Sequence, residues 1–193
     1  MSETARRGPY AKGIAKREQI LHEALAAYAE SDASGPSLRA IAARVGLSER
    51  GLLHYFASRD ELLVAILAER DAVDLTLFDH DGPLANLVGQ QAHTSKTPGL
   101  VRLFLEMAVA APDKAHAAHD FFARRYVRLR ALLKRMVILD NERDGSSKLS
   151  DDNAEFAARM LIAASDGLQL QWLLDPSIDM EADLQRMAKL LRS

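Results

Sequence analysis

Residues 37–62 read SLRAIAARVGLSERGLLHYFASRDEL, and their spacing is typical of two short helices that cross at a tight turn. Ala42 is a small residue where the two backbones approach, and Gly46 follows at the turn, where a positive φ is favourable only for glycine. Ser48 is placed to cap the second helix through its hydroxyl. Apolar side chains that lock the helices together complete the pattern: Ile41, Val45, Leu47 and Leu52. The stretch therefore predicts a helix-turn-helix.

The chain upstream of this motif is basic. Five cations lie within the first 17 residues, against a single Glu3: Arg6, Arg7, Lys12, Lys16 and Arg17. Residues 1–60 carry nine Lys and Arg against seven Asp and Glu, whereas residues 61–193 carry 16 against 20. Such asymmetry indicates contact with nucleic acid at the basic end. Taken alone, the helix-turn-helix pattern also fits two unrelated amphipathic helices joined at a glycine, and the basic segment also fits an ordinary solvated tail. The joint occurrence of the motif and the basic segment favours DNA binding.

Composition favours an all-α protein. The chain has 32 Ala and 29 Leu but only 8 Val and 7 Ile, and helices prefer the first pair whereas strands prefer β-branched residues. The absence of cysteine excludes disulfides, thiol nucleophiles and thiolate metal sites. The longest apolar run, residues 62–68, is too short to span a membrane, and the start does not resemble an export signal. We expect a cytoplasmic protein without membrane contact.

Apolar periodicity and breaker clusters predict about nine helices and no strand. The first covers residues 14–30, and two short helices divided at Gly46 follow. The remaining six are expected at residues 58–78, 84–93, 98–110, 113–141, 152–174 and 180–191. The helix from residue 58 opens with Ser58-Arg-Asp-Glu61, which fits a capping box.

Residues 37–62, and the preceding Arg17-Glu-Gln-Ile-Leu-His-Glu-Ala-Leu25, resemble the DNA-binding domain of TetR-family transcriptional repressors. The close resemblance runs from Lys16 to Leu67, and Asp166 to Pro176 looks like the end of that family's eighth helix. The resemblance implies a DNA-binding domain with a basic arm at residues 1–60 and an effector-binding and dimerisation domain at residues 61–193. Two departures are visible: Ser31 to Pro36 replaces an aromatic residue and a glycine, and Leu53 replaces a tyrosine that contacts phosphate in many relatives.

If the second helix enters the major groove, its first residues face base edges. Arg50 is the best candidate for reading a base, because a guanidinium can bind guanine through two hydrogen bonds. Arg39 and Arg59 begin the flanking helices and suit phosphate contacts, which would make affinity salt-dependent. The resemblance implies that His54 and Tyr55 meet backbone or bases. The predicted DNA-binding residues are Arg39, Ser48, Arg50, Gly51, His54, Tyr55 and Arg59.

The last two predicted helices carry a seam for another helix. Apolar and small residues repeat at alternating spacings of four and three along residues 152–174, and the final helix adds three more. The resemblance implies that both helices form a homodimeric four-helix bundle, which would set two reading heads on a near-palindromic operator. The predicted interface residues are Phe156, Met160, Ala163, Gly167, Leu170, Leu174, Leu184, Met187 and Leu191.

The resemblance also implies an effector pocket among the helices between the two ends of the chain. We expect a small apolar or aromatic effector, although each candidate side chain also fits plain core packing. Binding would act on DNA through the helix at residues 58–78. The predicted lining residues are Phe104, Met107, Phe121, Phe122, Tyr126 and Trp172.

Two other functions remain open. A metal-dependent phosphohydrolase would use the pairs His80-Asp81 and His119-Asp120, with His116 one turn away, but no converging third ligand is evident. The other is a helical protein-interaction module that has lost DNA binding. Leu53 leaves this alternative open, because it stands where many relatives have a tyrosine that contacts phosphate. The sequence favours a regulator, no enzyme, no cofactor and no metal; it does not name the effector or the operator.

Overall fold

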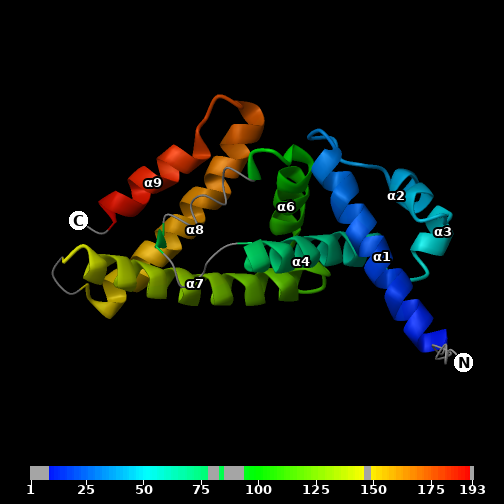
Figure 1. Ribbon diagram of the computed structural model, residues 1–193, viewed down its shortest axis with the longest axis horizontal. Coiled ribbons are helices and arrows are strands. Elements are labelled where there is room, and N and C mark those ends of the chain that lie inside the picture. The colour runs from blue at the N-terminus through cyan, green and yellow to red at the C-terminus, as the bar shows by residue number, and fades with distance from the viewer. Residues whose placement is uncertain (1–8, 78–82, 85–93, 146–148, 192–193) are drawn as a thin grey trace, which may run out of the picture.

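The computed structural model describes residues 9–77, 83–84, 94–145 and 149–191 (Figure 1). These ranges contain eight helices and no strand, which confirms the predicted all-α fold. The predicted helix at residues 84–93 lies outside the described residues apart from Leu84, and so do Arg6-Arg7 and His80-Asp81. The helices are α1 (Pro9–Glu30), α2 (Leu38–Arg44), α3 (Glu49–Leu52), α4 (Arg59–Leu77), α6 (Pro98–Ala110), α7 (Ala118–Arg143), α8 (Asp151–Leu174) and α9 (Met180–Leu190).

Two helices start at positions that differ from the prediction. α1 begins at Pro9 rather than near residue 14, and proline is favoured at the first helical position because it has no N–H to leave unpaired. α7 begins at Ala118 rather than at Asp113. The N–H of Ala115 donates to Asp113 Oδ1 (2.9 Å), and that of Ala118 donates to His116 Nδ1 (3.1 Å). Side chains thus hold this segment in turns before the helix starts.

Short polar side chains define where several helices begin. Ser37, Ser48 and Ser150 each accept a hydrogen bond from the backbone N–H three residues later. At the start of α4, Ser58 Oγ accepts from the N–H of Glu61 (3.0 Å), and Glu61 Oε2 accepts from the N–H of Ala57 (2.7 Å). The capping box predicted there is present, with its return bond made one residue before the cap.

The helices form an elongated molecule in which α2 and α3 lie at one end and α9 at the other (Figure 1). A continuous apolar cluster joins the N-terminal helices to α6 and the start of α7, and it includes Ile20, Ile41, Leu52, Phe104 and Phe122. A second cluster is built mainly from α7, α8 and α9. The N-terminal helices therefore pack directly on the rest of the chain, and α4 and α6 mediate that contact.

Gly99, in the first turn of α6, lies close against the end of α1. A Cβ at Gly99 would lie 2.1 Å from Ser31 Oγ and 2.7 Å from the carbonyl oxygen of Tyr28, at the end of α1. Since backbone cannot move aside as a flexible side chain can, a larger residue would push α6 away from α1.

We expect Gly99→Ala to lower the free energy of unfolding by about 1–3 kcal/mol, the usual cost of overpacking. Gly13→Ala in α1 is the matched control, because a Cβ there meets nothing within 4 Å and alanine favours helix by about 0.5–1 kcal/mol. Urea unfolding followed by circular dichroism measures both. Equal stabilities for the two variants would contradict the close contact of α1 with α6.

Candidate functional site

The helix-turn-helix has the geometry that its sequence predicted. Gly46 has a φ of 68°, the left-handed conformation expected of the turn. Ile41, Ala42 and Leu52 are buried, with Ala42 1% exposed. Lys16 Nζ donates to the carbonyl oxygen of Val45 (2.7 Å), so a cation of the basic arm stabilises the end of α2. The motif thus packs against α1 and is hydrogen-bonded to it.

Its outer face carries polar and basic side chains. Arg39 in the first turn of α2, and Arg50 and His54 at and after α3, are all exposed. Helical hydrogen bonds continue beyond α3, because the N–H of His54 donates to the carbonyl oxygen of Arg50 (3.1 Å). Tyr55 is partly buried against the core, and the His54 ring packs edge-on against it with centroids 5.9 Å apart. Arg39, Arg50 and His54 are therefore free of the core and accessible to a partner.

Other residues of the predicted DNA-binding set also have roles within the fold. Ser48 Oγ accepts from the N–H of Gly51 (3.1 Å), which is the expected cap. A Cβ at Gly51 would meet only ordinary contacts, so the fold does not require glycine there. Arg59 pairs with Asp60 (3.7 Å) and with Glu106 of α6 (3.6 Å). Arg59 thus links the first turn of α4 to α6.

The histidines considered for an enzyme make local contacts. His116 Nε2 lies 3.3 Å from Asp60 Oδ2, and His119 Nδ1 lies 2.9 Å from the carbonyl oxygen of Ala111. In the described part of the chain no three His, Asp or Glu side chains are grouped so that they can hold a metal ion.

A cavity lies between α4, α7, α8 and α9, and none of the six predicted effector-contacting residues lines it. Phe104, Met107 and Phe122 are buried in the core that joins the two ends of the molecule, with Phe121 and Tyr126 packed against it. Trp172 belongs to a separate small cluster with Val101 and Met180. The side chains that do line the cavity are Arg70, Asp74, Leu84, Thr94, Arg125, Leu129, Leu133, Leu161, Ile162, Ser165, Asp166, Gln169 and Leu184.

The aromatic residues are drawn into the core by one another and by arginines. The rings of Phe104 and Phe122 have centroids 5.3 Å apart. The guanidinium carbons of Arg70 and Arg125 lie 5.3 Å and 4.9 Å from the centroid of Phe104. Arg70 and Arg125 thus make cation–π contacts with the buried Phe104 ring, and the same two side chains line the cavity.

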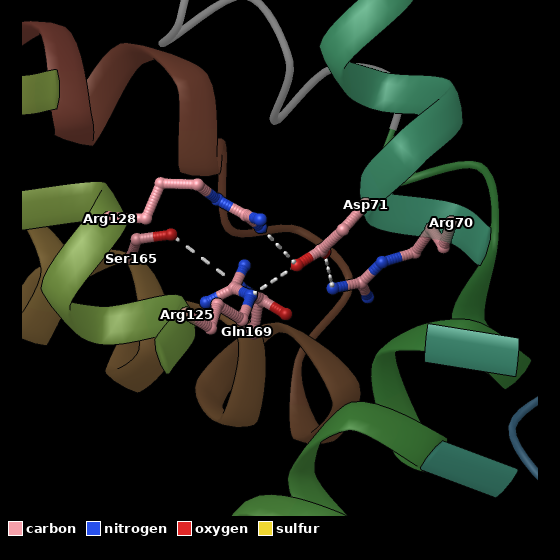
Figure 2. Close-up of polar contacts among 6 residues, drawn as sticks. All are labelled: Arg70, Asp71, Arg125, Arg128, Ser165 and Gln169. Atoms are coloured by element: carbon pink, nitrogen blue, oxygen red, sulfur yellow. Dashed lines mark hydrogen bonds and ion pairs between the residues drawn. The ribbon is translucent and has the colours of Figure 1, made fainter. Parts of the chain in front are cut away.

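Arginines from two helices converge on one carboxylate beside the cavity (Figure 2). Asp71 of α4 accepts from Arg125 Nε (3.0 Å) and from Arg128 Nη2 (3.3 Å), both on α7, and from its neighbour Arg70 (3.3 Å). Asp71 is 10% exposed, whereas Arg70 and Arg125 are each 14% exposed. This buried cluster connects α4 to α7.

A second polar pair joins α7 to α8. The Tyr126 hydroxyl donates to Asp166 Oδ2 (2.7 Å). Burial raises the pKa of Asp166, although the Tyr126 hydrogen bond and the nearby Arg125 oppose that shift. Burial together with Asp166 also raises the pKa of Tyr126 above its ordinary value. Burial lowers the pKa of Arg70, and Asp71 opposes that change.

This polar cluster was not predicted from the sequence. One available signal was the set of polar residues that interrupt an otherwise apolar helical face, such as Ser165 and Gln169, four positions apart on α8. Neither that signal nor the spacing along α4 indicates that Asp71 meets arginines more than 50 residues away.

An apolar strip on α8 faces outward. Phe156 is 48% exposed, Leu170 52% and Leu174 81%. Ala163 is also exposed, and a Cβ at Gly167 would meet nothing within 4 Å. Exposed apolar strips of this kind mark surfaces that bind other molecules.

The predicted residues of α9 divide between the inside and the surface. Leu184 is 4% exposed and lines the cavity, so it packs within the chain rather than on an outer face. Met187 and Leu191 are partly buried against the second core cluster. The exposed side chain is Leu190, at 65%, which the sequence analysis did not select. Met187 and Leu190 line a groove with Ala163 and Gly167 of α8.

The N-terminal helices have the geometry of a helix-turn-helix, a motif that occurs in DNA-binding proteins. Residues 20–66 match the model of the family described as bacterial regulatory proteins, tetR family. The chain thus carries the N-terminal domain of the TetR family and has the fold of TetR-family transcription regulators. The comparison with curated proteins gives no match.

Solved structures resemble the whole chain at low sequence identity. A TetR transcription regulator from Haloarcula marismortui is 24% identical with a TM-score of 0.69, and the alignment covers 93% of this chain and 97% of that one. A transcriptional regulator from Rhodococcus sp. Rha1 is 21% identical with a TM-score of 0.63, covering 91% and 95%. The multidrug binding protein EbrR, complexed with imidazole, is 23% identical with a TM-score of 0.56, covering 91% and 94%. None of the described helices combines the length and the apolar character that crossing a membrane requires.

Proposed function

We propose that this protein is a homodimeric repressor that binds a near-palindromic DNA operator and releases it when a small molecule occupies the cavity. Residues 1–60 form the DNA-binding domain, and residues 61–193 form the domain for effector binding and dimerisation. The observation that carries the proposal is the helix-turn-helix, in which Ile41, Ala42, Val45 and Leu52 are buried while Arg39, Arg50 and His54 are each exposed. In this arrangement Arg50 reads a base and Arg39 contacts phosphate.

The outward apolar strip on α8 supports the homodimer. Exposed leucines at 52% and 81% are costly in a single chain, and a second copy packed through Gly167 and Ala163 would cover them. A two-fold dimer presents two recognition helices to two half-sites.

The cavity supports a small-molecule effector, and the resemblance to a structure described as a multidrug binding protein is in keeping with one. Arg70 lines the cavity and adjoins Asp71, which bonds to Arg125 and Arg128 of α7. A ligand that contacts Arg70 or Arg125 therefore acts directly on α4, the helix that follows the recognition segment. Release requires that the ligand bind the DNA-incompetent position of α4 more tightly than the competent one.

Fluorescence anisotropy with duplex DNA from upstream of the protein's own gene tests the proposal. We expect Arg50→Ala to weaken sequence-selective binding by about 1–3 kcal/mol, because each good base contact is worth that much. Wild-type affinity should also fall steeply between low and moderate salt. Arg124→Ala, at a 77% exposed position on α7, is the control and should bind like wild type.

The outcomes separate the two candidate functions. Failure to bind even nonspecific DNA at low salt would rule out the regulator and support the alternative, a helical protein-interaction module. An equal loss in Arg50→Ala and Arg124→Ala would instead mean that Arg50 contributes only general charge.

A further inference from the structure

The cavity between α4, α7, α8 and α9 has two chemically different halves. Leucine and isoleucine side chains from several helices form one half: Leu84, Leu129, Leu133, Leu161, Ile162 and Leu184. The other half presents Arg70, Arg125, Ser165 and Gln169, together with Asp74 and Asp166. A ligand that fits both halves has an apolar body and a polar head.

The polar half presents two guanidinium groups, those of Arg70 and Arg125, to the cavity. A guanidinium carries five N–H groups, and three guanidinium groups share the single carboxylate of Asp71. Arg70 Nε is buried and makes no hydrogen bond with the described residues. Buried donors without acceptors are costly, so a ligand that brings oxygen acceptors gains free energy here.

Of the two acidic side chains that line the cavity, Asp166 already has a hydrogen-bond donor, and Asp74 lies close enough to Arg70 to act on its charge. Asp166 already accepts the Tyr126 hydroxyl at 2.7 Å. Burial raises the pKa of Asp166, although the Tyr126 hydrogen bond, Arg125 and Arg70 oppose that shift. The neighbouring Arg70 and Arg125 are 14% exposed, so solvent screens their charges only weakly.

We propose that the cavity binds an amphipathic carboxylate, with its carboxylate at Arg70 and Arg125 and its hydrocarbon part among the leucines. This assignment rests on the proposed effector function and names its ligand class. Guanidinium groups bind carboxylates through paired, charge-assisted hydrogen bonds that a neutral head group cannot match. The sequence led us to expect a purely apolar or aromatic effector. Because the cavity has a polar half, we propose instead an acid with an apolar tail.

Isothermal titration calorimetry on the full-length protein without DNA tests the assignment. The carboxylate probes are hexanoate and phenylacetate, and hexanol and hexylammonium test the head group with the hexanoate tail. We expect at least one carboxylate to bind about tenfold or more tightly than both hexyl controls, the scale of a charge-assisted hydrogen bond. Arg125→Gln should abolish that preference. Arg124→Gln makes the same change at the adjacent, 77% exposed position and should preserve it.

Ile162→Trp provides a second variant, because it fills the apolar half and leaves the Asp71 cluster intact. It should weaken carboxylate binding about tenfold or more, while thermal unfolding shows that the chain remains folded. Equal binding of hexanol, tighter binding of hexylammonium, or no saturable binding of either carboxylate would overturn the assignment. Because no DNA is present, each of these results leaves operator binding to be judged separately by anisotropy.

Discussion

Asp71→Asn is expected to lower the free energy of unfolding by about 3 kcal/mol, because it removes a negative charge that three arginines share directly. Asparagine keeps the shape of the side chain but loses the charge. Arg70 and Arg125 are 14% exposed and would remain charged in a poorly solvated site, whereas Arg128 is 52% exposed and can turn to water. We therefore place the loss near the lower end of the range for broken buried ion pairs.

Equilibrium unfolding in urea measures this effect at one fixed protein concentration, since subunit association makes apparent stability depend on concentration. Asp120→Asn on α7 is the matched control: Asp120 is 78% exposed, and its partner Arg124, 3.9 Å away, is 77% exposed. The control should change stability by less than about 0.5 kcal/mol. A loss in Asp71→Asn no larger than in the control would mean that the cluster does not fasten α4 to α7.

Leu170→Arg is expected to convert the proposed dimer into monomers and to weaken operator binding about a hundredfold or more. Leu170 is an exposed residue of the apolar strip on α8, and Leu170→Arg would bring a charged side chain from each subunit into the proposed two-fold interface. A lone monomer loses the gain in affinity that two linked DNA-binding heads provide. Sedimentation velocity measures the first effect, and anisotropy with operator DNA measures the second.

Leu170 is 52% exposed within one chain, so the variant should fold normally. Val127→Arg introduces the same side chain at a 59% exposed valine of α7, outside the predicted interface, and should leave both measurements unchanged. A Leu170→Arg protein that still sediments as a dimer would place the subunit interface elsewhere.

The helix-turn-helix was predictable because its determinants are local. Ser48 caps α3 through the N–H of Gly51, and Gly46 adopts the positive φ of the turn. Both effects act over a few residues, so spacing alone reveals them. The outward strip on α8 was also predictable in part, since heptad spacing identifies a helix face. Spacing did not distinguish Leu184, which is buried in the chain, from the exposed Leu190.

The cavity was not predictable in this way, because its chemistry comes from residues that are distant in sequence. Phe104 and Phe122 are aromatic residues of the kind that line ligand pockets, yet they pack against each other in the core. Phe104 also packs against Arg70 and Arg125. Asp71 meets Arg125 only because α4 and α7 pack against each other, and Gly99 is required only because α6 touches the end of α1. Local sequence specifies the secondary structure and the DNA-reading motif. The packing of helices sets which faces meet, and therefore which side chains become core, cavity or surface.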